Sequence, residues 1–363
     1  SATFSFSTDE PAGGEDDGCI ECNSYTETTQ EDLSNIRFPQ TFQEIDWKRI
    51  EQYDLRANTL PWHMEVLPLE SIDIRNRRLY TAIPALYDLR RDFNEPRPNA
   101  WILNTLEGID EPGEWACLDG KIYLYPKSGT EDIYVPVLTE LIRLDNGIID
   151  GNSNFSAAVR DIVFDGITFT GGDFRIMKED DITVQHDWMV VDEPDALLRI
   201  RNASNIKVRN CHFIKTGGTG LRLDRFAQQI EIDNNIFSNL GRGGINIAGR
   251  GPGYGDVSKN NIIKYNYLEK VGMEKWASVA ILLDNSSNNY VHHNYITDTY
   301  FSGIVVTGPR QLMFAGQAEG VADFYQGREF HFFEMEPSIL EFMEANGGVL
   351  EGSQEAMKFV YNY

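Results

Sequence analysis

Apolar and polar positions alternate in short runs along most of the chain. From residue 68 onward, alternating segments such as "AWILN" and "GKIYLYP" are interrupted by Gly, Pro, Asn and Asp. This pattern is typical of short β-strands joined by turns. The sequence therefore predicts an all-β fold.

One alternating segment recurs from about residue 157. The copies are "DIVFDGITF", "NIKVRNCHF", "QIEIDNNIF", "NIIKYNYL" and "NYVHHNYI". Their last apolar residues form one column, whose members lie 44, 24, 31 and 28 residues apart: Phe169, Phe213, Phe237, Leu268 and Ile296. The shortest interval predicts a coil of 24 residues, to which the longer intervals add insertions.

A second alternating strand recurs in step with the first. Its copies include "GLRLDRF", "GINIAGR", "AILLDNS" and "GIVVTGP". A coil that stacks on its own next copy buries one apolar face and needs no crossover helix. We therefore predict a right-handed parallel β-helix, with an additional N-terminal β-rich region and loop insertions. The residues expected to stack inside it are Leu221, Ile245, Ile281 and Ile304.

Asparagines stand two positions before the apolar column in three copies, at Asn235, Asn266 and Asn294. Polar backbone groups in a buried turn need hydrogen-bond partners. Side-chain amides stacked at the strand spacing of about 4.8 Å supply them. We therefore expect these asparagines to be structural.

Three regions follow from the patterning. Residues 1–67 are acidic and weakly patterned, and we expect an irregular segment. Residues 68–145 are predicted to form a β-rich region that leads into the helix, and residues 146–363 the β-helix itself. Because "FVYNY" at 359–363 restarts the repeat, we expect the helix to be truncated at its C-terminal end.

The formal net charge of −24 excludes one class of partner, since an acidic surface repels nucleic acid. No apolar run is long enough to span a membrane. The opening "SATFSFSTDE" lacks an initial methionine, which favours a processed protein that is secreted or periplasmic, although a trimmed chain fits equally. The sequence leaves the oligomeric state open.

No cofactor is expected from the motifs. Cys19 and Cys22 form a CxxC without a second CxxC or paired histidines, which disfavours a zinc site and leaves a disulfide or two thiols as alternatives. Cys211 occupies an inward position of the repeat and is expected to be buried. No motif indicates calcium, so we expect no bound metal ion.

The outward positions of the second strand carry the candidate chemistry. One predicted column contains Arg201, Asp224, Ala248, Asp284 and Thr307. Asp224 and Asp284 are two coils apart, which separates their Cα atoms by about 9.6 Å. Because inverting glycosidases hold two carboxyl groups about 6.5–9.5 Å apart, this spacing favours inversion.

Long insertions flank the same predicted sheet and add further candidates. Glu334 is a third candidate catalytic carboxyl, with His331 beside it. The remaining predicted substrate-binding residues are Arg199, Arg201, Arg222, Asn246, Tyr254, Asp256 and Trp276.

Several segments are similar to those of known carbohydrate-active β-helix enzymes. They include "WILNTLEGIDEPGEWACLDGKIYLYP", "FDGITFTGG", "NNIFSNLGRGGI" and "LDNSSNN". Over about residues 68–308 the chain resembles β-helical glycoside hydrolases of families 110, 120 and 141, which act on galactosides, xylosides and fucosides. The related polygalacturonase pattern has its catalytic aspartates where this chain has Gly220, Gly244, Ala280 and Gly303.

The resemblance implies an exported glycoside hydrolase that cleaves a polysaccharide or oligosaccharide with two carboxyl groups in a groove along the helix. Galactosides, fucosides and xylosides are the implied substrates, including anionic or sulfated ones. A polysaccharide lyase is the alternative, because three arginines form a basic patch that suits a uronate. A non-catalytic β-helix that binds glycans is a third possibility.

Overall fold

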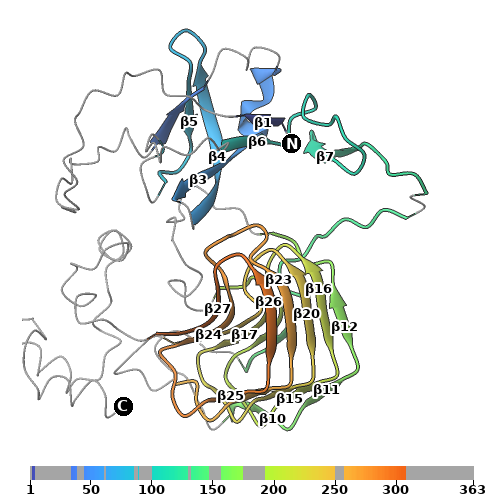
Figure 1. Cartoon of the computed structure of the whole chain (residues 1–363), viewed down its shortest axis with the longest axis vertical. Coiled ribbons are helices and arrows are strands. Elements are labelled where there is room, and N and C mark those ends of the chain that lie inside the picture. Colours follow the sequence, from blue (N-terminus) through green and yellow to red (C-terminus); the bar gives the residue numbers. More distant parts are fainter. Residues whose placement is uncertain are drawn as a thin grey trace, which may run out of the picture. The chain divides into compact units, whose positions relative to one another are not determined.

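The structure is a computed structural model of the 363-residue chain. It describes residues 2–4, 34–38, 45–60, 63–85, 89, 100–129, 132–146, 157–174, 193–249 and 257–307. The described residues up to Ile133 form one compact unit, and those from Tyr134 onward form another (Figure 1).

The first unit is built on a six-stranded antiparallel sheet. A 3-10 helix, η2 (Trp47–Gln52), precedes its third strand, and a separate hairpin follows the sheet. The core includes Leu55, Leu67, Leu79 and Ile102. In sheet order the strands are β1 (Ala2–Phe4), β6 (Ala100–Leu103), β3 (Asp54–Leu60), β4 (His63–Asp73), β5 (Arg78–Thr81) and β2 (Asn35–Arg37), and the hairpin is β7 (Trp115–Leu118) with β8 (Lys121–Leu124).

Part of the segment expected to be irregular is therefore regular. η2 and β3 lie within residues 1–67. The strand β3, "DLRANTL", buries Leu55 and Ala57 while Arg56 and Asn58 are half-buried. Because only one of these two buried side chains is large and apolar, the alternation is weak in the sequence, and pairing with β4 and β6 completes the strand.

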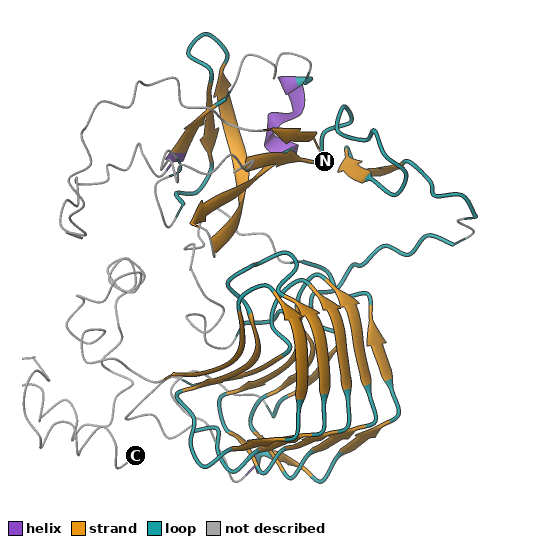
Figure 2. Ribbon diagram, in the orientation of Figure 1, coloured by secondary structure: helices purple, strands orange, loops and turns teal. Residues whose placement is uncertain are grey.

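The second unit is a parallel β-helix. All of its described strand pairs are parallel, and equivalent strands of successive coils lie side by side in the same sheet (Figures 1 and 2). We name the sheets A to D. Sheet A contains β9 (Ile142–Leu144), β13 (Ala196–Ile200), β17 (Thr219–Asp224), β21 (Ile245–Ala248), β24 (Val279–Asp284) and β27 (Ser302–Thr307).

The other three sheets complete each coil. Sheet B contains β10 (Val159–Arg160), β14 (Ala203–Ser204) and β18 (Ala227–Gln228). Sheet C contains β11 (Val163–Asp165), β15 (Lys207–Arg209), β19 (Glu231–Asp233), β22 (Ile262–Lys264) and β25 (Tyr290–His292). Sheet D contains β12 (Thr168–Thr170), β16 (His212–Thr216), β20 (Ile236–Leu240), β23 (Tyr267–Val271) and β26 (Tyr295–Thr299).

The register confirms both predicted core columns. In sheet A, Ile281 pairs with Ile245 on one side and Ile304 on the other, and Ile245 pairs in turn with Leu221. In sheet D, the pairing runs from Phe169 to Ile296 through every predicted member. The rings of the three phenylalanines stack with centroids 4.8 and 4.7 Å apart, because identical inward positions repeat at the strand spacing.

The predicted asparagine ladder is also present. The Oδ1 of Asn266 accepts hydrogen bonds from the backbone N–H and the side-chain amide of Asn235, at 3.0 and 2.9 Å. The Oδ1 of Asn294 does the same for Asn266. A second ladder, which the sequence reading did not identify, runs through Asn261 and Asn289. Each buried corner thus pairs its polar backbone groups with the next coil.

Candidate functional site

The outward face of sheet A contains two columns of side chains in the predicted register. Asn246 lies between Arg222 and Leu282, and Ala248 follows two positions later on the same face, beside Asp224. Asp284 pairs with Thr307 at the other end. The two columns are Arg199, Arg222, Asn246, Leu282 and Val305, and Arg201, Asp224, Ala248, Asp284 and Thr307.

The middle of this face is buried, whereas we expected it to be open. Arg222, Asp224 and Asn246 have no exposed surface, and Asp284 is 5% exposed. Burial decreases toward β27, where Val305 and Thr307 are half-buried. At the opposite end of the same face, Arg143 of β9 is exposed, so both ends of the face approach solvent, and Asp284 lies one strand from the β27 end.

Asp224 and two arginines form a buried ion-pair cluster. The Nε of Arg199 lies 2.8 Å from Asp224 Oδ2, and the Nη2 of Arg222 lies 3.0 Å from Asp224 Oδ1. Arg199 also contacts Glu140, at 3.3 Å. Charged groups that are buried away from water need such partners, since an unpaired charge in the interior is strongly destabilising. The cluster therefore holds Asp224 in one orientation.

The cluster continues through Asp195 to a third arginine. The Nη1 of Arg222 lies 3.4 Å from one oxygen of Asp195, and the Nη1 of Arg242 lies 2.9 Å from the other. Arg242 also pairs with Glu193, at 3.0 Å. Burial opposes the charge of Arg222, but Asp224 and Asp195 outweigh it and raise the pKa of the guanidinium. The arginines of this face are thus balanced by carboxylates, as is Arg201 by Asp145, at 3.1 Å.

Asp284 lies in a different environment. Burial raises the pKa of its carboxyl to about 8, although the amide of Asn285 and the charge of Arg222 act in the opposite direction. The Nδ2 of Asn285 donates a hydrogen bond to Asp284 Oδ2 at 3.1 Å. At neutral pH the protonated form of Asp284 therefore predominates, which makes it a proton donor.

Asn246 lies on β21, the strand beside that of Asp284, and its side-chain amide is buried. Within the described part of the chain, neither its Oδ1 nor its Nδ2 has a hydrogen-bond partner, although the side chain is buried. Gly243 makes room for it, because a Cβ there would lie 2.4 Å from Asn246 Oδ1. A buried amide in this state needs a donor and an acceptor from a water molecule or a ligand.

The sequence-predicted residues separate into three groups. Arg199, Arg222, Asp224 and Asn246 lie together on the buried face, with Arg201 and Asp284 in the same columns. Trp276 is half-buried and stacks on Tyr300, with ring centroids 6.1 Å apart. Tyr254, Asp256, His331 and Glu334 lie outside the described residues, as does the expected truncation at residue 363.

Sequence reasoning missed four charged residues of the cluster. Glu140 precedes the first strand of sheet A, Glu193 and Asp195 precede the second, and Arg242 lies between two glycines after β20. Their ion pairs within the cluster join positions 27 to 59 residues apart, which a local pattern does not reveal. The available signal was the position of each residue at the edge of a strand of sheet A.

The comparisons with known proteins agree with the fold of the second unit. The family model described as "Right handed beta helix region" matches residues 140–278 and 199–316. The fold is thus a right-handed parallel β-helix. Among solved structures, one named "Glycoside hydrolase" is similar, with a TM-score of 0.61 and 18% sequence identity over 77% of this chain. The chain spans 55% of the length of that structure, and no curated protein matches the sequence.

Two further searches concern the described residues. They contain no helix that is long and apolar enough to cross a membrane. In the same residues, no three His, Cys, Asp or Glu side chains are grouped so that they could hold a metal ion.

Proposed function

We propose that this β-helix is a glycoside hydrolase in which Asp284 is the general acid. The observation that carries the proposal is a carboxyl group on the outward face of sheet A whose pKa is raised to about 8. A carboxylic acid that is protonated at neutral pH can give its proton to a glycosidic oxygen as the bond breaks. The similarity to a structure named glycoside hydrolase supports the same class of reaction.

Asp224 is the proposed second carboxylate. It lies two strands from Asp284, with Ala248 between them in the column, so the Cα separation is about 9.6 Å by strand spacing. Ala248, the smallest side chain of the column, lies between the two carboxyls and is buried. A separation of this size suits a water molecule attacking from the opposite side of the sugar, which inverts the anomeric centre.

The substrate that we propose is a neutral glycan. Arg199, Arg201 and Arg222 pair with carboxylates of this chain, so the basic patch that suggested a uronate or sulfate is already balanced. The amide of Asn246 offers one donor and one acceptor, which suits a pair of sugar hydroxyls. These contacts favour hydrolysis over a lyase reaction, which needs positive charge to stabilise the uronate.

Protonation of the glycosidic oxygen by one carboxyl and removal of a proton from water by the other require no cofactor. Because the proposed substrate is a polysaccharide or oligosaccharide found outside cells, we also propose that the protein is secreted or periplasmic.

The test measures the release of reducing ends from neutral galactan, xylan and fucan oligosaccharides, with a uronan as comparison. Asp284→Asn should reduce kcat by about 10²- to 10⁴-fold, which is the usual contribution of a general acid. Asp298→Asn, which changes an exposed carboxylate on β26, is the matched control and should retain full activity.

The products distinguish the alternatives. Inversion predicts that the first-formed sugar has the opposite anomeric configuration, which proton NMR of the early product detects. Ultraviolet absorbance of an unsaturated uronide would instead show a lyase. Full activity of Asp284→Asn would remove Asp284 from the site, and binding without product from any glycan would support a non-catalytic β-helix.

A further inference from the structure

The last described coil of the β-helix is open at one end. In sheet A, Ile281 and Leu283 of β24 are 0% and 8% exposed. Their inward-facing counterparts on β27, Ile304 and Val306, are 49% and 76% exposed. Side chains that would be core in any other coil are thus exposed at this end. Such an end is a template for another strand, because no described strand pairs with its outer backbone edge.

The asparagine ladder stops at the same end. Asn235 and Asn266 each give their backbone N–H to the Oδ1 of the asparagine in the next coil. Within the described residues, no acceptor is present for the backbone N–H of Asn294. The corner therefore specifies what would complete it: a chain segment with an asparagine in register and an apolar residue three positions earlier.

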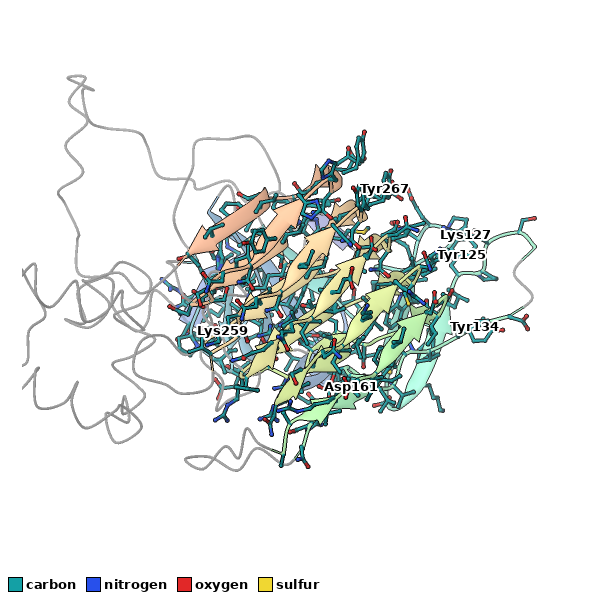
Figure 3. All side chains as sticks on the ribbon, turned by 90° about the horizontal axis from the view of Figure 1, so that it is seen from below. Tyr125, Lys127, Tyr134, Asp161, Lys259 and Tyr267 are labelled. Carbon is teal, nitrogen blue, oxygen red and sulfur yellow. The ribbon has the colours of Figure 1, made fainter. Side chains whose placement is uncertain are left out.

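Residues 358–363, "KFVYNY", have this pattern. Aligned with "YVHHNY" at 290–295, the segment places Phe359 over Val291 and Asn362 over Asn294. Tyr363 then continues a column in which Tyr267 already stacks on Tyr295, with ring centroids 5.4 Å apart and the Tyr267 side chain on the outside of the helix (Figure 3). We propose that residues 358–363 bind to the edge of β25 and the Asn294 corner as the next strand of sheet C.

A second copy of the chain is a poorer occupant of this corner. The first coil of a stacked copy would present Ile167 where the ladder has asparagine, since Ile167 precedes β12 as Asn294 precedes β26. Isoleucine offers no side-chain acceptor, so the N–H of Asn294 would stay unpaired. Residues 358–363 would supply a hydrogen-bond acceptor for the N–H of Asn294, whereas a second chain stacked in the same register would not.

A disulfide trap tests the register in the full chain. In-register neighbours on parallel strands have Cα atoms about 4.8 Å apart, within the range of about 4.4–6.8 Å that disulfides require. Val291→Cys with Phe359→Cys should cross-link within one chain under mild oxidation, as shown by mass spectrometry of the joined peptides. Val291→Cys with Val360→Cys is the control, because consecutive residues of a strand point to opposite faces.

A second measurement follows the N–H of Asn294 by hydrogen exchange. Asn362→Ala should increase its exchange rate tenfold or more, whereas Asn346→Ala, which lies outside the pattern, should leave it unchanged. Equal cross-linking of the two cysteine pairs, or cross-links between chains, would overturn the proposal. So would an exchange rate of the Asn294 N–H that is the same in the wild type and in Asn362→Ala.

Discussion

Asp284 and Asp224 end strands with the same alternating pattern, "VAILLD" and "TGLRLD", yet the two carboxyls differ chemically. Asp224 lies between Arg199 and Arg222, which bind both of its oxygens. Asp284 has Leu282 two positions earlier on its own strand, and Asn285 as its hydrogen-bond donor. A carboxyl with two guanidinium partners is held as an ion pair, whereas burial favours the protonated form of Asp284 despite the opposing hydrogen bond from Asn285.

The pKa of Asp284 makes stability depend on pH. Burial raises this pKa from 3.8 to about 8, so between these values the folded state holds a proton that the unfolded state has released. The free energy of unfolding should therefore fall as pH rises through this window. Thermal unfolding of the wild type from about pH 5 to pH 8 should show a decreasing Tm relative to Asp284→Asn, which lacks the titrating group. If the Tm of both proteins changed with pH in the same way, other titrating groups would be responsible.

At the scale of the element, a column of small residues fixes how sheet A meets its neighbours. Gly220, Gly244, Ala280 and Gly303 occupy equivalent positions of four successive strands. A Cβ on Gly244 would lie 2.5 Å from the carbonyl oxygen of Ala280 and 2.8 Å from a methyl of Leu268. A Cβ on Gly303 would meet nothing closer than 3.6 Å. The close approach of the coils thus requires glycine in the middle of the helix and tolerates a side chain at its open end.

Gly244→Ala should destabilise the protein by about 1–3 kcal/mol, because the extra carbon forces a backbone shift in a well-packed interior. Gly303→Ala is the matched change at the equivalent position and should alter stability by less than about 0.5 kcal/mol. Urea denaturation followed by tryptophan fluorescence measures both. Equal effects of the two substitutions would contradict the close contact at Gly244.

At the scale of the whole molecule, the described residues contain two separate hydrophobic cores. One includes Leu67 and belongs to the antiparallel sheet, and the other includes Ile245 and belongs to the β-helix. No residue is shared between these two clusters. A unit with its own core can unfold in its own cooperative transition.

Calorimetry should therefore show two unfolding transitions. Leu67→Ala should lower the midpoint of one and Ile245→Ala that of the other, each by the equivalent of about 2–5 kcal/mol, since each leaves a cavity in a buried core. Both side chains are completely buried, so the two substitutions are matched controls for each other. A single transition that moves with either variant would show that the units unfold together.

The amino-acid sequence determined the β-helix, its register and its amide ladder. These features rest on repetition: identical positions in successive coils meet one strand spacing apart, so a column of Phe169, Phe213 and Phe237 can be read directly from the spacing of the repeats. It was less informative about the first unit, where a strand such as β3 has few apolar residues and depends on its partners.

Only the tertiary structure decided which outward residues form ion pairs and which carboxyl has a raised pKa. The contacts of Arg222 with Asp195 and of Arg199 with Glu140 join residues far apart in the chain. They turn a predicted basic patch into a balanced cluster and leave Asp284 with a raised pKa. The physical reason is that a repeat specifies position along the helix, whereas the charge state of a side chain depends on burial and on every neighbour that the fold brings to it.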